Sequence, residues 1–136
     1  MSGRAKKKRL YFAHSMSTYG TPRERRALKL LRSRYPNFEI VNPGAKRWQK
    51  HVEFFYPLCG MGLFDLIAAR CDLVAAMPFA ADGAYGAGVY SEILSAHRAG
   101  VKLVRVNPDA IAPLDFTEAV PLSVARTRYR IKVGTQ

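Results

Sequence analysis

Apolar segments alternate with helical patterns along this chain, and that alternation constrains the fold more than any other feature. The segments apolar enough for buried strands are residues 9–14, 38–41, 72–79 and 101–106. Helical patterns follow at residues 22–35, 62–71, 88–99 and 122–132. Short connections between strands and helices favour right-handed βαβ units. We therefore expect an α/β fold with a mostly parallel sheet of four to five strands.

The segments between these elements are less regular. Residues 45–60 are aromatic and basic, and we expect them to be partly helical. Residues 107–120 contain Pro108 and Pro113, so we expect a loop there.

The first helix has a clear start signal. Thr21 can cap it, Pro22 suits its first position, and Glu24 is placed to complete a capping box. The charged residues of this segment are expected on its solvent face, and they are Arg25, Arg26, Lys29 and Arg32.

The charge of the chain is strongly basic. The net charge is +12 over 136 residues, and five of the cations lie in the first nine residues. We expect residues 1–8 to be a basic disordered arm and residues 9–136 to be one domain, since the length is usual for a single domain. A basic surface attracts polyanions, so a weak contact between the arm and nucleic acid is one interpretation. A solubilising surface is the other.

Several protein classes are disfavoured by the sequence. No apolar run approaches the roughly 20 residues that cross a bilayer, and no apolar signal-peptide core follows the basic start, so we expect a cytoplasmic protein. Cys59 and Cys71 do not make a disulfide framework. The histidines show no metal-ligand spacing with each other or with the cysteines, and we expect neither a metal nor a cofactor.

Candidate ligand contacts follow the first strand, because ligands of parallel sheets bind at the carboxyl ends of strands. His14 lies at the strand end, and Ser15 and Ser17 place hydroxyl groups before the start of a helix. Helix starts favour anions, so this segment is a candidate phosphate or sugar loop. Serine-rich turns without any ligand are also common.

Two further segments lie at the same edge. Gly86 and Gly88 permit a ligand to approach the backbone closely, and Glu92 follows one turn into the next helix, bordering its inner face. The alternative for Glu92 is a surface glutamate favoured by the helix dipole. Asn42 is a candidate ligand contact, or it caps its own turn.

The order of short motifs along the chain resembles a known superfamily. The motifs are residues 11–15 (YFAHS), 42–43 (NP), 71–74 (CDLV) and 88–92 (GVYSE). They resemble the nucleoside 2-deoxyribosyltransferase-like superfamily, which includes 2′-deoxynucleoside 5′-phosphate N-hydrolases. The resemblance covers about residues 9–106 and implies a flavodoxin-like three-layer sandwich and a homo-oligomer.

The resemblance also implies an activity. Glu92 falls on the family's nucleophilic glutamate, which attacks the sugar C1′ and releases the base of a nucleoside or nucleotide. Ser15 and the loop from Ser17 through Tyr19 to Gly20 fall where relatives hold the sugar or the 5′-phosphate. Tyr11 falls at an aromatic position near the site.

The chain departs from the family pattern in two places. Many relatives carry an aspartate six residues before the nucleophile, where this chain has Gly86, and Asp82 is the nearest acid. A second acid of the family falls on Phe64, with Asp65 one step away. The leading interpretation is an N-glycosidase or deoxyribosyltransferase. The alternatives are a non-catalytic nucleotide-binding module and a basic nucleic-acid-associated protein.

Overall fold

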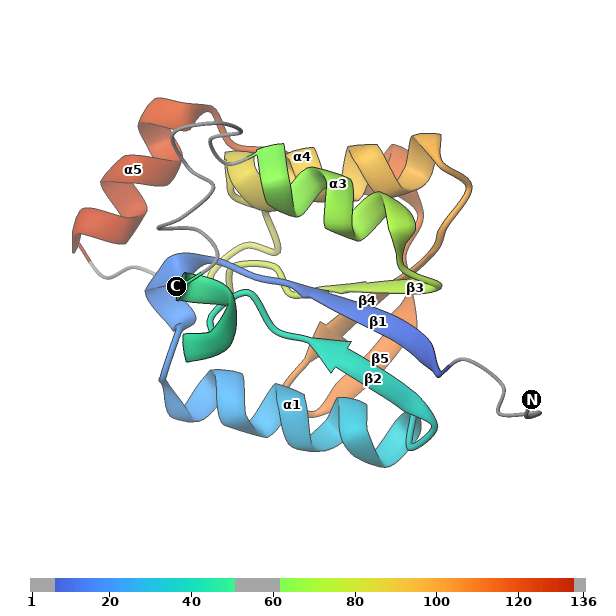
Figure 1. Cartoon of the computed structure of the whole chain (residues 1–136). Helices are drawn as coiled ribbons and strands as arrows, with labels where there is room; N and C mark the ends of the chain where they lie inside the picture. The colour runs from blue at the N-terminus through green and yellow to red at the C-terminus, as the bar shows by residue number, and fades with distance from the viewer. Residues whose placement is uncertain (1–6, 51–61, 134–136) are drawn as a thin grey trace, which may run out of the picture.

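The computed structural model describes residues 7–50 and 62–133, and its strands form one five-stranded sheet (Figure 1). The strands are β1 (Lys8–Ala13), β2 (Phe38–Val41), β3 (Leu73–Ala76), β4 (Lys102–Asn107) and β5 (Ala110–Pro113). Their order is β2-β1-β3-β4-β5, and every pair is parallel except β4 and β5. The predicted α/β fold with a mostly parallel sheet is therefore confirmed.

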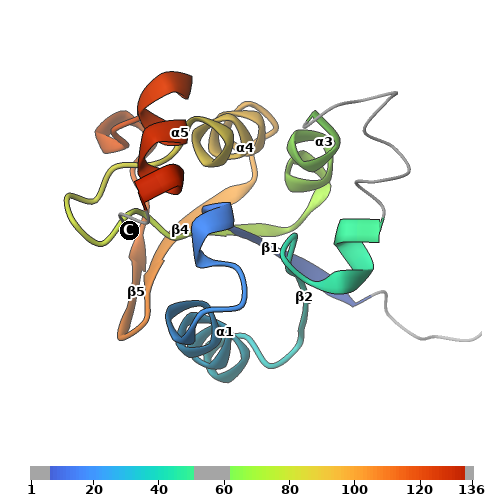
Figure 2. The ribbon, with the colours of Figure 1, turned by 90° about the vertical axis from the view of Figure 1, so that its left-hand side faces the viewer.

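Helices cover both faces of the sheet (Figures 1 and 2). They are α1 (Pro22–Arg34), α3 (Gly62–Arg70), α4 (Ala87–Arg98) and α5 (Val124–Val133), with short 3₁₀ turns η1 (Met16–Thr18) and η2 (Phe116–Glu118). Helix α1 lies on one face, whereas α3 and α4 lie on the other with α5 beside α4. These helices and the sheet make three layers.

Strand β1 connects the two halves of the core. Its side chains alternate, so Leu10 and Phe12 pack in the cluster under α1, while Tyr11 and Ala13 pack in the cluster under α3 and α4. All four are fully buried. The strand is apolar on both faces because each face is covered by helices.

The topology creates a crevice beside the end of β1. The chain passes from β1 to β2 on one side and returns to β3 on the other, so the direction of the connections reverses between β1 and β3. Ala13 pairs with Ala76 at the carboxyl ends of these strands. The loops after both strands therefore begin next to each other, at the position where open α/β sheets bind ligands.

Residues 107–120 differ from their prediction, because they contain a strand. A tight turn at Pro108 and Asp109 brings β5 back along β4, and Asn107 pairs with Ala110. The prolines suggested a loop, but Pro113 ends an edge strand, where a missing N–H group is tolerated. The prediction of a loop throughout this segment was wrong.

Other boundaries shift by a few residues. Strand β3 ends at Ala76, three residues before the predicted end at Phe79. Lys8, which was assigned to the arm, begins β1, and residues 1–6 of the arm lie outside the described residues. Residues 46–50 are helical, and the rest of the predicted segment 45–60 lies mostly in the part of the chain that is not described.

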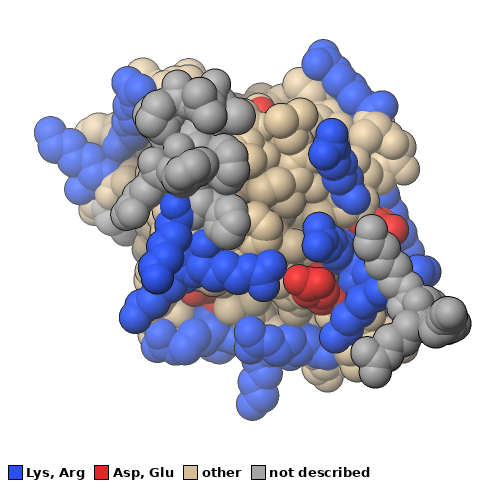
Figure 3. All heavy atoms as spheres, viewed as in Figure 1, with Lys and Arg blue, Asp and Glu red and all other residues tan. Residues whose placement is uncertain are grey.

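The surface is unevenly charged. Lys and Arg side chains gather on the side where α1 lies (Figure 3). Among the described helices, none combines the length and apolar character that crossing a bilayer demands.

Candidate active site

A cavity of about 450 Å³ opens at the carboxyl ends of β1 and β3. This volume lies within the usual range for small-molecule sites. Its walls come from the loop after β1, from α3, from the first turns of α4, and from α5. The lining residues are His14, Ser15, Met16, Tyr19, Phe64, Gly86, Ala87, Gly88, Val89, Glu92, Val124, Thr127, Arg128 and Ile131.

Glu92 is the buried acid of this cavity. Helix α4 turns Val89, Ile93 and Ala96 into the core, and Glu92 lies on the edge of the same face with 7% of its surface exposed. The hydroxyl of Tyr11 donates a hydrogen bond to Glu92 Oε2 at 2.8 Å. Tyr11 reaches this position because it lies on the α4 side of β1, so the sheet itself orients the carboxyl group.

Burial controls the protonation of Glu92. It raises the pKa of Glu92 to about 8, although the Tyr11 hydrogen bond lowers that pKa and the charge of Asp65 raises it further. Near neutral pH the side chain is therefore mostly a neutral acid. Burial, followed by the charges of Glu92 and Glu24, also raises the pKa of the Tyr19 hydroxyl.

Asp65 is a second acid near Glu92. It lies on α3 and accepts a hydrogen bond from the Ser91 hydroxyl at 2.7 Å. Burial raises the pKa of Asp65, and the Ser91 bond lowers it. Asp65 is thus bonded to Ser91, the residue that precedes Glu92. Its neighbour Phe64, and not Asp65, lines the cavity.

His14 is fixed by the protein on both sides of its ring. Nδ1 lies 3.0 Å from the Phe12 carbonyl oxygen and donates to it, because a carbonyl only accepts. Nε2 lies 2.7 Å from Glu24 Oε2. The ring also stacks on Phe12 at 3.9 Å between centroids. His14 therefore forms part of the cavity wall with both nitrogens already bonded.

Glu24 does not complete the predicted capping box. Thr21 caps α1 by accepting from the Glu24 backbone N–H at 3.3 Å, but the Glu24 carboxylate accepts from the Gly20 N–H at 3.1 Å and contacts His14. Asn42 adds a further hydrogen bond. Burial raises the pKa of Glu24, but these bonds outweigh it and hold the pKa below its ordinary value. Glu24 is therefore an ionised anchor for the loop after β1.

Six of the predicted contacts line the cavity, and they are His14, Ser15, Tyr19, Gly86, Gly88 and Glu92. Tyr11 reaches it only through Glu92. Three others support the surrounding loops instead. Ser17 bonds Ser15 at 2.9 Å, Gly20 has a positive φ of 74° and donates to Glu24, and Asn42 Oδ1 accepts from the Gly44 N–H at 2.9 Å.

Asp82 lies outside the cavity and holds α5 in place. Both of its oxygens bond Arg130, at 3.0 and 2.6 Å, and it accepts from the Ala84 N–H at 3.1 Å. The Arg130 bonds lower the pKa of Asp82 to about 2. The Arg130 guanidinium also lies 5.1 Å from the centroid of the Phe79 ring. Asp82 thus links α5 to the loop after β3.

Helix α5 supplies a wall that sequence reasoning missed. Thr127 accepts a hydrogen bond from the Ala87 N–H at 2.9 Å, in the first turn of α4. A Cβ atom on Gly86 would lie 3.1 Å from Thr127 Cγ2, so position 86 has little space for a side chain. Arg128 also lines the cavity. The only sequence signal was a helical pattern beyond the segment covered by the resemblance.

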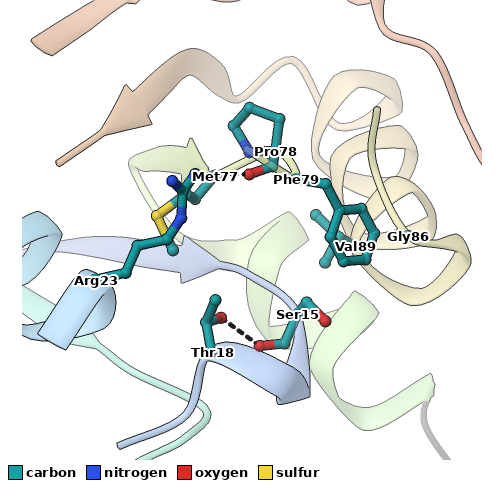
Figure 4. Close-up of a pocket in the computed structure, with 8 residues that line it drawn as sticks. All are labelled: Ser15, Thr18, Arg23, Met77, Pro78, Phe79, Gly86 and Val89. Atoms are coloured by element: carbon teal, nitrogen blue, oxygen red, sulfur yellow. Dashed lines mark hydrogen bonds between the residues drawn. The ribbon is translucent and has the colours of Figure 1, made fainter. Parts of the chain in front are cut away.

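A smaller cavity of about 10 Å³ adjoins this wall (Figure 4). It has room for about one water molecule. Thr18 donates to the Ser15 carbonyl at 2.5 Å, and Arg23 donates to the Pro78 carbonyl at 2.9 Å. The first bond closes the η1 turn, and the second ties α1 to the loop after β3.

Within residues 7–50 and 62–133, no three His, Cys, Asp or Glu side chains are grouped to hold a metal ion. In comparisons with family models, curated proteins and solved structures, nothing matches this chain.

Proposed function

We propose that this protein cleaves the N-glycosidic bond of a nucleoside or nucleotide, as an N-glycosidase or a deoxyribosyltransferase, with Glu92 as the nucleophile. The observation that carries the proposal is a buried carboxyl group, bonded to Tyr11, that lines a cavity of about 450 Å³. The motif order that resembles the deoxyribosyltransferase-like superfamily supports it.

The fold adds independent support. A strand order of 2-1-3-4-5 is that of flavodoxin-like sheets, which bind their ligand where β1 and β3 end. The chain has this order, with an antiparallel β5, and its cavity lies at that position. We include a flavodoxin-like classification in the proposal.

The reaction proceeds in two displacements. A Glu92 carboxylate oxygen bonds the sugar C1′ while the bond from C1′ to the base nitrogen breaks, and the electron pair of that bond leaves with the base. The base nitrogen takes up a proton from water. Water, or the nitrogen of a second base, then attacks C1′, the bond to Glu92 breaks, and the attacking group loses its proton.

The carboxylate form is required for this attack. Since burial raises the pKa of Glu92 to about 8, the reactive form is a minority near neutral pH. The Tyr11 hydroxyl favours the ionised form by donating to it. Tyr11 is thus the residue that makes Glu92 available as a nucleophile.

The substrate in this proposal carries a phosphate. Arg128 is the one Lys or Arg among the described lining residues, and it makes no ion pair with any other described residue. A guanidinium group favours phosphate. The resemblance also implies a homo-oligomer, which a mass measurement in solution tests.

The test is a panel of ribo- and deoxyribonucleosides and their 5′-monophosphates, with free base measured by chromatography. We expect release from a deoxynucleotide and its loss in Glu92→Gln. The matched control is Glu118→Gln, an exposed glutamate outside the cavity. Release that persists undiminished in Glu92→Gln, or no release from any member of the panel, contradicts the proposal.

A binding-only module is the second candidate, and two observations favour it. Position 86 has no acid and little space for one, and Asp82 is already paired with Arg130. Under this alternative, calorimetry detects nucleotide binding in the cavity while chromatography detects no free base.

A further inference from the structure

Helix α1 is far more basic than α3 and α4, which cover the other face of the sheet. Six of its thirteen residues are Lys or Arg, whereas α3 and α4 each contain one Arg and no Lys. The single acid of α1, Glu24, is buried and bonded to His14. The outward-facing side of α1 therefore carries positive charge with no acid of its own helix to offset it.

Little of this charge is neutralised by neighbouring elements. Arg26 pairs with Asp109, and Arg25 donates to the Gly20 carbonyl, which carries no charge. Lys29, Arg32 and Arg34 are exposed and make no ion pair with any described residue. Three exposed cations on one short helix are thus available to an external anion.

Strand β1 adds one cation, Lys8, to the side of the sheet that α1 covers, because Lys8 alternates with Leu10 and Phe12. Arg9 and Glu39 lie on the opposite side, where Arg9 and Arg47 both approach Glu39, at 3.9 and 3.8 Å. Lys8 lies 6.0 Å from the centroid of the Phe38 ring. Figure 3 shows Lys and Arg side chains gathered on this side of the molecule.

The spacing along α1 sets the charges in a line. Arg25, Lys29 and Arg32 are four and three residues apart, so they lie on one stripe of the helix. The stripe is about 10 Å long at 1.5 Å per residue, and the same length along a duplex axis holds about three phosphates of one strand, at about 3.4 Å of axial rise each. The cations of α5 lie at every second residue from Arg126 to Lys132, so they alternate between two faces.

The residue types on this surface indicate which class of polyanion it suits. The apolar residues of α1, which are Ala27, Leu28 and Leu31, are buried against the sheet. None of the exposed large apolar side chains of the described residues lies on α1 or β2. The surface therefore lacks the apolar side chains that enter a membrane and the exposed aromatic rings that stack on single-stranded bases. Arginine-rich stripes instead suit the phosphate oxygens of a duplex backbone.

From this arrangement we infer that the outer face of α1 binds the phosphate backbone of double-stranded DNA without reading its sequence. The surface lies outside the cavity of Glu92, so the inference goes beyond the proposed glycosyl transfer and does not depend on it. It also differs from binding through the basic arm, because the cations belong to a folded helix.

The experiment measures binding of the full chain to a fluorescein-labelled 20-base-pair duplex by anisotropy, over a range of KCl concentrations. The test variant replaces the three cations of the stripe, Arg25, Lys29 and Arg32, together with Gln. We expect at least about tenfold weaker binding at 100 mM KCl. The slope of log K against log salt should fall in magnitude by about 2.7, which is three contacts at about 0.9 each.

The matched control removes the same number of charges from the opposite side of the sheet. Arg70, Arg98 and Arg126, on α3, α4 and α5, are exposed and are replaced together with Gln. We expect this variant to bind nearly as tightly as the unaltered protein and to keep most of the salt slope. All substituted residues are exposed, and melting curves confirm that both variants fold.

Several outcomes overturn the inference. They are equal losses in the two variants, absence of duplex binding, and an unchanged salt slope in the α1 variant. Stronger binding to single-stranded DNA or to phosphatidylserine vesicles also overturns it. So does loss of binding on deletion of residues 1–6 when the α1 variant still binds, because the arm would then be the contact.

Discussion

Glu24 and Glu92 are both buried glutamates at the same edge of the sheet, yet their ionisation is opposite. Glu24 is 6% exposed and Glu92 is 7% exposed. Each bonds a side chain from the β1 segment, which is His14 for Glu24 and Tyr11 for Glu92. Nevertheless the pKa of Glu24 is below its ordinary value, whereas burial raises the pKa of Glu92 to about 8.

The difference is one of hydrogen-bond donors rather than of burial. Glu24 is bonded by an imidazole ring, a backbone N–H group and the Asn42 side chain. Among the described residues Glu92 has one hydrogen-bond donor, the Tyr11 hydroxyl, and the charge of Asp65 opposes its ionisation. A carboxylate whose oxygens accept several hydrogen bonds stays ionised and stabilises the fold. A buried carboxylate with few donors has a raised pKa and keeps the capacity to react.

The largest expected effect is that of Glu92→Gln. Base release should fall at least about a thousandfold, because the amide cannot act as the nucleophile. The fold should become more stable at pH 8. The folded pKa of about 8 exceeds the ordinary value of 4.5, so the unaltered protein loses stability as pH rises through this window. Denaturant unfolding between pH 5 and 9 checks this, and equal pH slopes in both proteins would contradict it.

Glu24→Gln should act on stability instead. The amide has one accepting oxygen and cannot serve both His14 and the Gly20 N–H, and the cost is about 3 kcal/mol in the free energy of unfolding. Since the folded pKa of Glu24 is depressed, its contribution is present above the ordinary value of 4.5 and is lost as pH falls further. Urea unfolding at pH 7 measures the change. A loss no larger than that of the exposed Glu118→Gln control would show that the anchor is unimportant.

Tyr11→Phe removes the hydroxyl that donates to Glu92, so it should widen the difference between the pKa values of Glu24 and Glu92. Without this bond the pKa of Glu92 rises further above 8, so the acidic limb of kcat/KM moves to higher pH. We expect about a tenfold lower kcat/KM at pH 7, equivalent to about one pKa unit. Tyr90→Phe, on α4, is the control. A pH profile identical to that of the unaltered protein would remove Tyr11 from the proposal.

Asn42→Ala should have the smallest effect. It removes one of the donors of Glu24 and the acceptor of the Gly44 N–H, at a cost of about 1 kcal/mol. The midpoint of acid unfolding should move to higher pH, because the pKa of Glu24 rises. Asn37→Ala, an exposed position before β2, should leave that midpoint in place. Equal shifts in both variants would mean that Asn42 does not tune Glu24.

Much of the fold could be predicted from local patterns. The apolar run of β1, the Thr21 cap and the inward-facing stripe of α4 each depend on nearby residues, and all are present. Strand β5 was missed because Pro108 and Pro113 suggested a loop, whereas an antiparallel edge strand accommodates both.

The candidate site was only partly predictable, for a physical reason. Ser15 follows β1 closely and Glu92 lies near the start of the helix after β3, so topology brings both to one edge. The role of Glu24 depends on His14, ten residues away, and a rule for helix starts assigns that carboxylate to a cap instead. Thr127 and Arg128 line the cavity because α5 packs against the rest of the domain. The position of α5 in space cannot be predicted from the periodicity of its sequence.

The wall formed by α5 has a consequence for synthesis on the ribosome. The cavity joins His14 near one end of the domain to Ile131 near the other, more than one hundred positions later. A nascent chain can pair β1 with β3 long before it can enclose a ligand. Ligand added during translation should therefore protect only chains that have emerged beyond Ile131.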